Sequence, residues 1–448
     1  MRSRTLILSV LCLAPLLVIA PSAKASLGEP IEAVPTGGKV LDVDIDVGNR
    51  GFVVIGWTER PKGASDDSLP VAYVRVKQPG EKKPRRAVRL GVASGAVNVE
   101  IGSGDLAVIT WSGSDGHIRY RQRRPRSSWS PVEVIGDRQI FYANTAVGPD
   151  GTVIATTRVG SLEVPETLGV LVSVKNPGSP EFSAWREVSG NANVGVDLDV
   201  VAGKDGQGTV AWSGLCPPGA GDPAYYVDID DQTQTEPIEL KNSNCTVWDL
   251  ELARDGAGRQ YLKIGTWTGL RLAVRNPDEP FPRMRSVTNS FKRANGDLAV
   301  SRNGHMALVW ATAKVYPTSY RYLTMNKGTN PTKVRTLLGP RMNVKRTRDV
   351  RLDSSMLPSG KLFTLWNRLG PPDSDLRYSQ TMGTSSWLPG TKYKRPAYTF
   401  PISRCITPYP ALVDTADDGS RLAWWIEEND RGEIKNVPFS AHAAERSN

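Results

Sequence analysis

The chain has 448 residues, of which 39% are hydrophobic and 23% are charged, and it contains 42 Gly, 33 Pro and only 3 His. Such a mixture of apolar and turn-forming residues excludes an intrinsically disordered chain and a collagen-like repeat. The scarcity of His leaves little material for catalysis or metal binding that depends on imidazole. The length suits one large closed domain or two to three ordinary ones, with a core that needs no disulfide.

The first 25 residues are typical of a secretory signal peptide. Arg2 and Arg4 precede an apolar stretch at residues 6–20, and the Ala-Lys-Ala sequence at 23–25 fits a cleavage site. The apolar stretch is short for a membrane span, and no later stretch is long enough. We therefore expect a secreted mature protein of residues 26–448 without membrane insertion. Removal of three basic residues and no acid lowers the net charge from +10 to about +7.

An internal repeat extends over the mature chain. In each of eight copies a strand leads to a turn with glycine, and a second strand ends six or seven residues later at a slot that usually holds Trp. The turn glycines lie about 53 residues apart. They are Gly51, Gly104, Gly151, Gly206, Gly256, Gly304, Gly360 and Gly419. The slot holds Trp57, Trp111, Thr157, Trp212, Leu262, Trp310, Trp366 and Trp425. Because Thr and Leu also occur there, we interpret the slot as a packing position, not a ligand platform.

The pattern within each repeat predicts four antiparallel strands. Apolar and polar residues alternate, and a third strand such as 71–76 and a fourth such as 87–90 follow the slot. Asp-Gly and Asn-Gly pairs at five of the turns are typical of hairpins. Repeated four-stranded units of this length indicate a β-propeller. We predict an all-β, single-domain, eight-bladed propeller, with seven blades as the alternative if one unit is an insertion.

The ends of the chain suggest how the ring closes. The eighth unit has a third strand expected at 433–439, and the tail after it offers no fourth. Residues 30–34 resemble the fourth strands expected at 131–135 and 237–240. We predict that this N-terminal strand completes the last blade and thereby covers an open strand edge.

A polar position also repeats, thirteen residues before the slot and at the start of the innermost strand. It holds Asp44, Asn98, Asn144, Asp199, Asp249, Asp297 and Asp353. In one interpretation each side chain accepts a backbone N–H within its strand or across a blade junction. In the other, a ring of carboxylates at the channel attracts a cation. We favour the structural interpretation, because so many like charges repel one another unless bases or a metal compensate.

Sequence motifs for catalysis and metal binding are mostly absent. There is no G-x-S-x-G motif and no P-loop, and the three His have no metal-ligand spacing. Asp42, Asp44 and Asp46 resemble the start of a calcium loop, but Gly48 is displaced and Val53 stands where a bidentate Glu is required. We expect no metal and no cofactor.

Three Cys remain in the mature chain, in a compartment that permits disulfides. Cys216 follows the second strand of the fourth unit and Cys245 follows its fourth strand, so both lie at the same face of the ring. We predict a disulfide between Cys216 and Cys245. Cys405 is then a buried inert thiol or an exposed one.

Basic residues cluster in two runs, at 82–89 and at 119–126. Both runs suit an anionic polymer such as a wall glycan or a nucleic acid. The competing interpretation is that they lie on outer-edge strands, where long basic side chains prevent edge-to-edge pairing. We favour the second interpretation, and secretion argues against a nucleic-acid partner.

Residues 104–136, GDLAVITWSGSDGHIRYRQRRPRSSWSPVEVIG, resemble the blades of secreted bacterial propeller-repeat proteins of the sialidase-like and fucose-lectin-like superfamily. The shared features are a strand ending in Trp, a D-G-x-I/V turn and a W-S-x-P-V strand. Trp follows Gly by three residues in the Asp-boxes of sialidases and by six here, so no sialidase site is implied. In fucose lectins, Arg, Glu and Trp between blades bind sugar. The resemblance thus suggests a sugar site formed by Arg119, Trp129, Glu133, Trp185, Arg186 and Glu187.

Together these features predict a secreted, non-enzymatic propeller that binds an extracellular glycan or protein. The alternative is a glycoside hydrolase or polysaccharide lyase on the same scaffold, because a fold does not determine a reaction. We expect a monomer that binds no nucleic acid.

Overall fold

The structure, a computed structural model, describes residues 38–48, 51–65, 67–102, 104–140, 142–161, 164–195, 197–214, 223–241, 247–266, 269–288, 296–313, 317–338, 350–369, 377–387, 398–403, 412–415, 421–424, 426–428, 434–436 and 440–442. Within these ranges every regular element is a β-strand, and all pairs are antiparallel. No helix that could cross a membrane occurs among the described residues. The expected all-β fold is confirmed.

The first sheet contains seven strands in chain order. They are β1 (Gly38–Val47), β2 (Val53–Pro61), β3 (Val71–Lys77), β4 (Val88–Ile101), β5 (Ala107–Gly113), β6 (Ile118–Arg123) and β7 (Glu133–Val134). The long strand β4 pairs with β3 through its first part and with β5 through its last part. It therefore serves as the fourth strand of the first repeat and the first strand of the second.

The next five repeats each form a separate four-stranded meander, as predicted. The third and fourth units contain β8 (Asn144–Val147), β9 (Val153–Ser161), β10 (Val164–Lys175), β11 (Arg186–Glu187), β12 (Leu198–Ala202), β13 (Gly208–Ser213), β14 (Ala224–Ile229) and β15 (Ile238–Glu239). The fifth and sixth contain β16 (Val247–Arg254), β17 (Gln260–Thr266), β18 (Gly269–Arg275), β19 (Arg285–Ser286), β20 (Gly296–Val300), β21 (His305–Ala313), β22 (Pro317–Asn326) and β23 (Arg335–Leu338). The seventh contains β24 (Val350–Met356), β25 (Leu362–Leu369), β26 (Arg377–Trp387) and β27 (Tyr398–Ser403).

The last repeat is described in five short strands. Its strands are β28 (Leu412–Thr415), β29 (Arg421–Trp424), β30 (Ile426–Glu428), β31 (Ile434–Asn436) and β32 (Ser440–His442). β32 pairs with β29 and β31 pairs with β30, and the two antiparallel registers differ by a single residue. The pairings therefore continue one another along the second and third strands of the unit, and β31 lies where the third strand was expected, at 433–439. Residues 30–34 lie outside the described residues.

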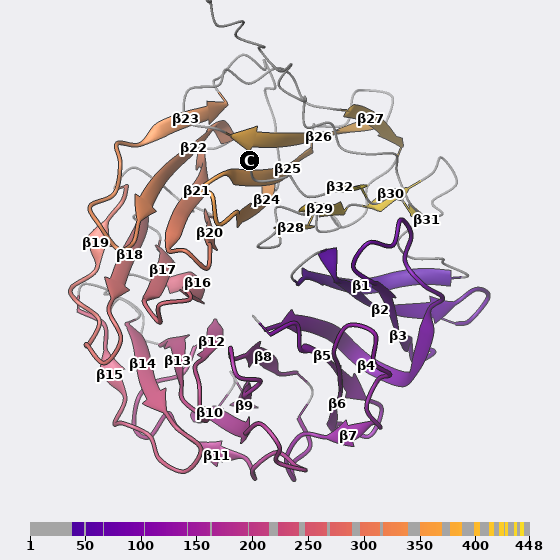
Figure 1. The fold of residues 1–448 in the computed structure, drawn as a ribbon, viewed down its shortest axis with the longest axis horizontal. Coiled ribbons are helices and arrows are strands. Elements are labelled where there is room, and N and C mark those ends of the chain that lie inside the picture. Colours follow the sequence, from indigo (N-terminus) through magenta and orange to yellow (C-terminus); the bar gives the residue numbers. More distant parts are fainter. Residues whose placement is uncertain are drawn as a thin grey trace, which may run out of the picture.

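The sheets are arranged radially around a centre, which is the arrangement of a β-propeller (Figure 1). Each innermost strand contacts the innermost strand of the next unit, in the order β1, β4, β8, β12, β16, β20, β24 and β28, and β28 contacts β1. The apolar side chains of each sheet pack against those of its neighbours, so the core lies between units and not within one of them.

The slot at the end of the second strand is buried wherever its side chain is described. Trp57 and Trp111 are 1% exposed, and Trp212 and Trp310 are fully buried. Trp111 packs with Val54 and Val74 of the preceding unit. Trp212 likewise packs with residues of the third unit and Trp310 with residues of the fifth. The indole therefore joins neighbouring units.

Two repeats depart from the spacing counted in the sequence. In the second, Asp105 and not Gly104 takes the left-handed conformation, with φ of 57°. In the fifth it is Gly258, with φ of 86°, and not Gly256. In most units the slot lies six residues after the turn glycine, so the slot residue of the fifth unit is Ile264 and not Leu262. The fifth unit is thus offset by two residues from the sequence alignment.

We call the space between the outer strands of two neighbouring units an outer seam. Aromatic and basic side chains fill two of these outer seams. Between the second and third units, Tyr120 lies edge-on to Phe182, with ring centroids 4.8 Å apart, and Lys175 lies 5.4 Å from the Tyr120 ring. Between the fourth and fifth units, Tyr226 and Phe281 are 5.1 Å apart, and Arg275 lies 4.4 Å from the Phe281 ring. The two seams therefore contain the same three kinds of side chain.

We predict that Trp212→Ala or Trp310→Ala lowers the free energy of unfolding by about 3–5 kcal/mol, because a buried indole is replaced by a cavity between units. Denaturant unfolding measures the loss, and Leu69→Ala is the matched control because Leu69 is 51% exposed. A slot that recognises a ligand would instead give variants of nearly normal stability that lose binding.

Candidate functional site

Side chains of the innermost strands link one unit to the next. Three Asp on β1 accept backbone N–H groups of β4, joining Asp42 to Val97, Asp44 to Val99 and Asp46 to Ile101. The first bond is 2.9 Å long and the second 2.7 Å. The intervening residues Val43, Ile45 and Val47 face the core. The alternation in this segment thus directs carboxylates toward the free edge of the next strand.

The same contact recurs around the centre. Asp199 accepts the N–H of Leu252 at 2.7 Å, and Glu251 accepts that of Leu298 at 2.7 Å. Asn144 donates its side-chain amide to the carbonyl oxygen of Leu198 at 2.5 Å. Asn98 accepts a hydrogen bond from the hydroxyl of Thr145 on β8. At these positions the side chain holds the adjacent innermost strand.

The register shows that Glu251 and not Asp249 occupies the repeated polar position of the fifth unit. In other units the slot residue pairs with a residue on the innermost strand, and the polar residue comes directly after that partner. In the fourth unit, for example, Trp212 pairs with Leu198, and Asp199 follows Leu198. In the fifth unit Ile264 pairs with Leu250, and Glu251 follows. The alignment of the repeats missed this residue because it was anchored on Gly256, whereas the left-handed turn position is Gly258, two residues later.

Lys263 on β17 is the centre of a charged cluster with Asp249 and Glu251. Its side chain is 0% exposed, and its Nζ lies 2.8 Å from both Asp249 Oδ1 and Glu251 Oε1. It also donates to the carbonyl oxygen of Gly296 on β20 at 2.7 Å. Burial alone would lower the pKa of Lys263, but the attraction of the two carboxylates raises it above its usual value. Lys263 is therefore charged and neutralises part of the acidic ring.

The remaining carboxyl groups of this cluster are shifted toward their neutral forms. Burial, with Asp249 as a second cause, raises the pKa of Asp197 to about 6. Burial raises the pKa of Asp199 to about 7 and that of Asp297 well above its usual value. Perturbed carboxyl groups are typical of functional sites but also of buried structural networks. Among the described residues, no cluster of His, Cys, Asp and Glu could hold a metal ion.

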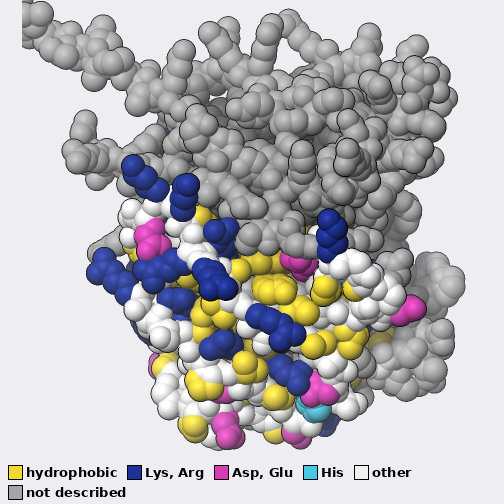
Figure 2. All heavy atoms as spheres, turned by 90° about the vertical axis from the view of Figure 1, so that its right-hand side faces the viewer, with side chains coloured by type: hydrophobic (Ala, Val, Ile, Leu, Met, Phe, Trp, Pro, Cys, Tyr) yellow, Lys and Arg dark blue, Asp and Glu magenta, His cyan; other side chains and the backbone are white. Residues whose placement is uncertain are grey.

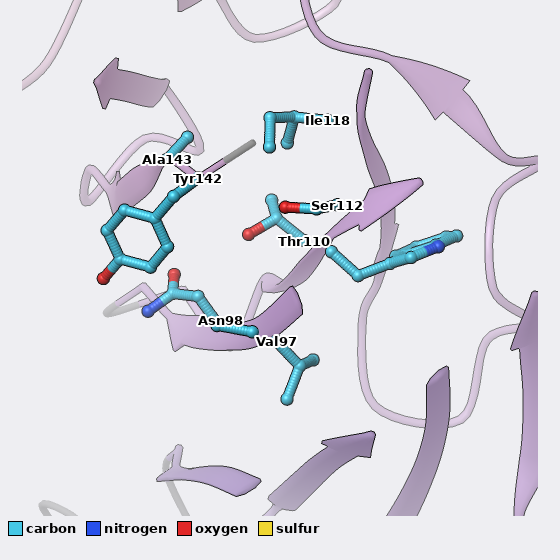
Figure 3. A pocket seen from close by; sticks show the side chains of 9 residues that line it. Val97, Asn98, Thr110, Ser112, Ile118, Tyr142 and Ala143 are labelled. Atoms are coloured by element: carbon cyan, nitrogen blue, oxygen red, sulfur yellow. The ribbon is translucent and has the colours of Figure 1, made fainter. Parts of the chain in front are cut away.

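A small niche lies beside this inner region (Figure 3). Its volume is about 10 Å³, and its lining includes Asn98, Thr110 and Tyr142. The Tyr142 hydroxyl donates to Asn144 Oδ1 at 2.5 Å. A niche of this volume accommodates a single water molecule, so it cannot hold a sugar ring.

The six residues expected at a sugar site lie on the outer parts of the second and third units, and the structure divides them among different contacts. Arg119 forms a salt bridge with Asp115 at 2.8 Å. Trp129 packs against the core between the first two units, 5.4 Å from Arg123. Glu133 accepts hydrogen bonds from Tyr120 and from Lys175, the latter at 3.3 Å.

The other three residues belong to the third unit. Trp185 is 4% exposed and donates its Nε1–H to the Ile135 carbonyl at 3.0 Å. Arg186 donates to the backbone carbonyls of Asp230 and Thr233 in the fourth unit. Glu187 is exposed and accepts from the Ser189 hydroxyl at 3.1 Å. The side chains of five of the six thus have contacts that hold strands or units together.

The two basic runs meet on one surface. The backbone N–H of Arg126 donates to Gln78 Oε1 at 2.8 Å, which joins the outer turn of the second unit to that of the first. Burial and, second, the charge of Arg85 lower the pKa of Arg123. Figure 2 shows Lys and Arg side chains gathered on this side of the molecule. We call the surface formed by residues 82–89 and 119–126 the basic face.

Four basic side chains of residues 82–89 are exposed and have no hydrogen bond or ion pair with any described residue. They are Lys82, Lys83, Arg86 and Arg89. Glu81, the sole acid in residues 75–89, is bound by Arg85 at 2.7 Å. The basic face therefore keeps uncompensated positive charge.

Several predicted features lie outside the described residues. These are Cys216, Cys245 and Cys405, the signal peptide and the turn at Gly419. The disulfide therefore stays a prediction. Three buried basic residues were not singled out from the sequence, and they are Lys263, Lys175 and Arg275. Each of them lies inside or at the end of an apolar strand, and that unusual position could have drawn attention to it.

No protein-family profile and no curated protein sequence matches the chain. The chain is similar in structure to β-propeller proteins. The BP39L lectin from Burkholderia pseudomallei has 12% identity and a TM-score of 0.48, with 82% of this chain and 99% of the lectin covered. The β-propeller domain of the Trilobed protease from Pyrococcus furiosus has 9% identity and a TM-score of 0.47, with 81% of this chain and 99% of that domain covered. A PL25 ulvan lyase has 12% identity and a TM-score of 0.45, with 76% of this chain and 91% of the lyase covered.

We predict that Lys263→Met lowers the free energy of unfolding by about 3–5 kcal/mol at neutral pH, because two partly buried carboxylates lose the counter-charge of a fully buried ammonium. The loss should be smaller near pH 4, since the pKa of Glu251 is already raised and protonation removes the unpaired charge. Chemical unfolding of the natural chain and the variant at neutral pH and near pH 4 measures this loss of unfolding free energy. Lys241→Met, at an exposed position, is the control, and an equal loss at both pH values would contradict the electrostatic explanation.

Proposed function

We propose that the protein is a secreted, monomeric, non-enzymatic β-propeller that binds an acidic extracellular glycan on its basic face. The observation that carries this proposal is the set of four exposed basic side chains at 82–89 without acidic partners. A polymer with regularly spaced carboxylate or sulfate groups can bind such a surface without a deep pocket. A nucleic acid offers similar charge, but the predicted signal peptide favours an extracellular partner.

We further propose that the ring has eight blades and that residues 30–34 complete the last one. Eight innermost strands in mutual contact, including β28 with β1, support the blade number. The sheet of β28, β29 and β32 has three strands among the described residues, which leaves its outer edge available for a further strand. An added N-terminal strand would cover that edge.

Deletion of residues 26–36 should lower the melting temperature or cause aggregation, because the outer edge of the last sheet would be exposed. Thermal unfolding and light scattering measure both effects. Deletion of residues 443–448 is the control. An unchanged melting curve and a soluble monomer would contradict closure by this strand.

The test of glycan binding is to replace Lys82, Lys83, Arg86 and Arg89 with Gln. Affinity for polygalacturonate should fall about tenfold or more, and the dependence of binding on salt should weaken, because charge–charge contacts are lost. Isothermal titration calorimetry at several salt concentrations measures both quantities. A matched control replaces four exposed lysines elsewhere, namely Lys204, Lys241, Lys327 and Lys333, with Gln.

Equal weakening in both variants would mean that only net charge matters, and the basic face would not be the site. Aggregation of the first variant without loss of affinity would instead support the role of these residues in protecting the outer strand. Binding of an acidic protein but not of an acidic polysaccharide would favour the protein partner.

The second candidate function is a glycoside hydrolase or polysaccharide lyase. The observation that favours it is the inner group of carboxyl groups with raised pKa values, Asp197 at about 6 and Asp199 at about 7. Groups that titrate near neutral pH can act as general acids or bases. New reducing ends or unsaturated uronate products during the polygalacturonate experiment would establish this alternative.

A further inference from the structure

The outer seam between the fifth and sixth units contains a cavity of about 230 Å³. Its walls are formed by side chains of β18 and β22, and by the segments before β19 and β23. Leu272, Leu323 and Met325 are 3–5% exposed and form part of the apolar wall. The cavity is distinct from the basic face, which lies on the first two units.

The register explains why this seam is hollow. In the fourth unit the slot residue Trp212 pairs with Tyr225 on the third strand, and Tyr226 comes next. In the fifth unit the slot residue Ile264 pairs with Arg271, and Leu272 comes next. Leu272 therefore stands where the fourth unit has Tyr226. A short aliphatic side chain replaces a phenol ring on this wall.

The opposite wall shows the same replacement. The N–H of Ser183 donates to the carbonyl of Val174, and the N–H of Thr332 donates to that of Thr324. Ser183 and Val174 of the third unit therefore correspond to Thr332 and Thr324 of the sixth. It follows that Pro331 corresponds to Phe182, and Met325 to Lys175. Pro331 and Met325 thus occupy the places of the aromatic ring and the cation that fill the other seam.

Two arginines lie at the rim of the cavity. Arg283 and Arg285 are exposed, and Arg285 donates to Asn330 Oδ1 across the seam at 3.3 Å. No carboxylate forms an ion pair with either guanidinium among the described residues. The cavity therefore combines an apolar interior with positive charge at its opening.

We propose that this cavity binds a small aromatic carboxylic acid, with the ring inside and the carboxylate on the two arginines. The homologous seams show what the space accepts, because Phe182 and Phe281 place a ring there. An apolar cavity of about 150 Å³ is large enough to bind benzene, so the volume here accommodates a substituted ring. Arginine pairs well with carboxylates, which accounts for the charged end of the ligand.

The probe is 3-phenylpropionate, with the neutral 3-phenylpropanol for comparison, and binding is measured by calorimetry and ligand-observed NMR on the full mature chain. We expect a dissociation constant of about 0.1–1 mM for the acid. The double variant Arg283→Gln/Arg285→Gln should bind the acid about tenfold more weakly and the alcohol unchanged.

The decisive variant fills the cavity with the residues of the neighbouring seam, Leu272→Tyr together with Pro331→Phe. It should lose binding of both probes and melt at the same or a higher temperature, because internal rings replace the ligand. Ile238→Tyr, which adds a ring on an exposed outer strand, is the control. If the double variant does not fold, Leu272→Phe alone serves the same purpose.

Three results would overturn the proposal. These are absence of binding to the natural chain at millimolar concentration, undiminished binding by the filled variant, and binding of a neutral hexose in place of the aromatic acid. None of these results depends on glycan binding by the basic face, so the two proposals succeed or fail separately.

Discussion

The free edge of each innermost strand is the constraint on which this structure depends. In a radial arrangement of sheets the first strand of every unit pairs on one side only, so its backbone N–H groups on the other side have no ladder partner. Here a carboxylate or amide from the preceding unit supplies the missing contact, as Asp44 does for Val99 and Asp199 for Leu252. The same bonds that satisfy the backbone also fix the position of one unit relative to the next.

This solution brings acidic groups together around the centre, and the structure limits the resulting repulsion in two ways. Lys263 places a buried positive charge between Asp249 and Glu251. The raised pKa of Asp297 shows that its ionised form is disfavoured by burial and by neighbouring carboxylates. A ring that looks like a cation site in the sequence is therefore partly compensated by the chain itself.

The outer seams use a different arrangement, and it explains where ligands can bind. Arg275 is 6% exposed and bonds to Asp228, Gln260 and Thr209, so it joins the fourth and fifth units through one guanidinium. Where the ring and cation are retained, the seam is closed. Where Leu272, Met325 and Pro331 replace them, a cavity remains. Variation among repeats thus creates a site without altering the inner strands.

The sequence alone determined the strand content, the repeat and the burial of the slot tryptophans, because period-two alternation and glycine turns are local patterns. It also located both basic runs. Only the tertiary structure showed that these runs adjoin through Arg126 and Gln78, and that Trp185, expected to contact sugar, is buried against the second unit. It also showed that Glu251 replaces Asp249 at the repeated polar position, that Lys263 forms ion pairs with both acids and that one seam is hollow. These features depend on strand register and on contacts between residues about 50 positions apart, which no local pattern specifies.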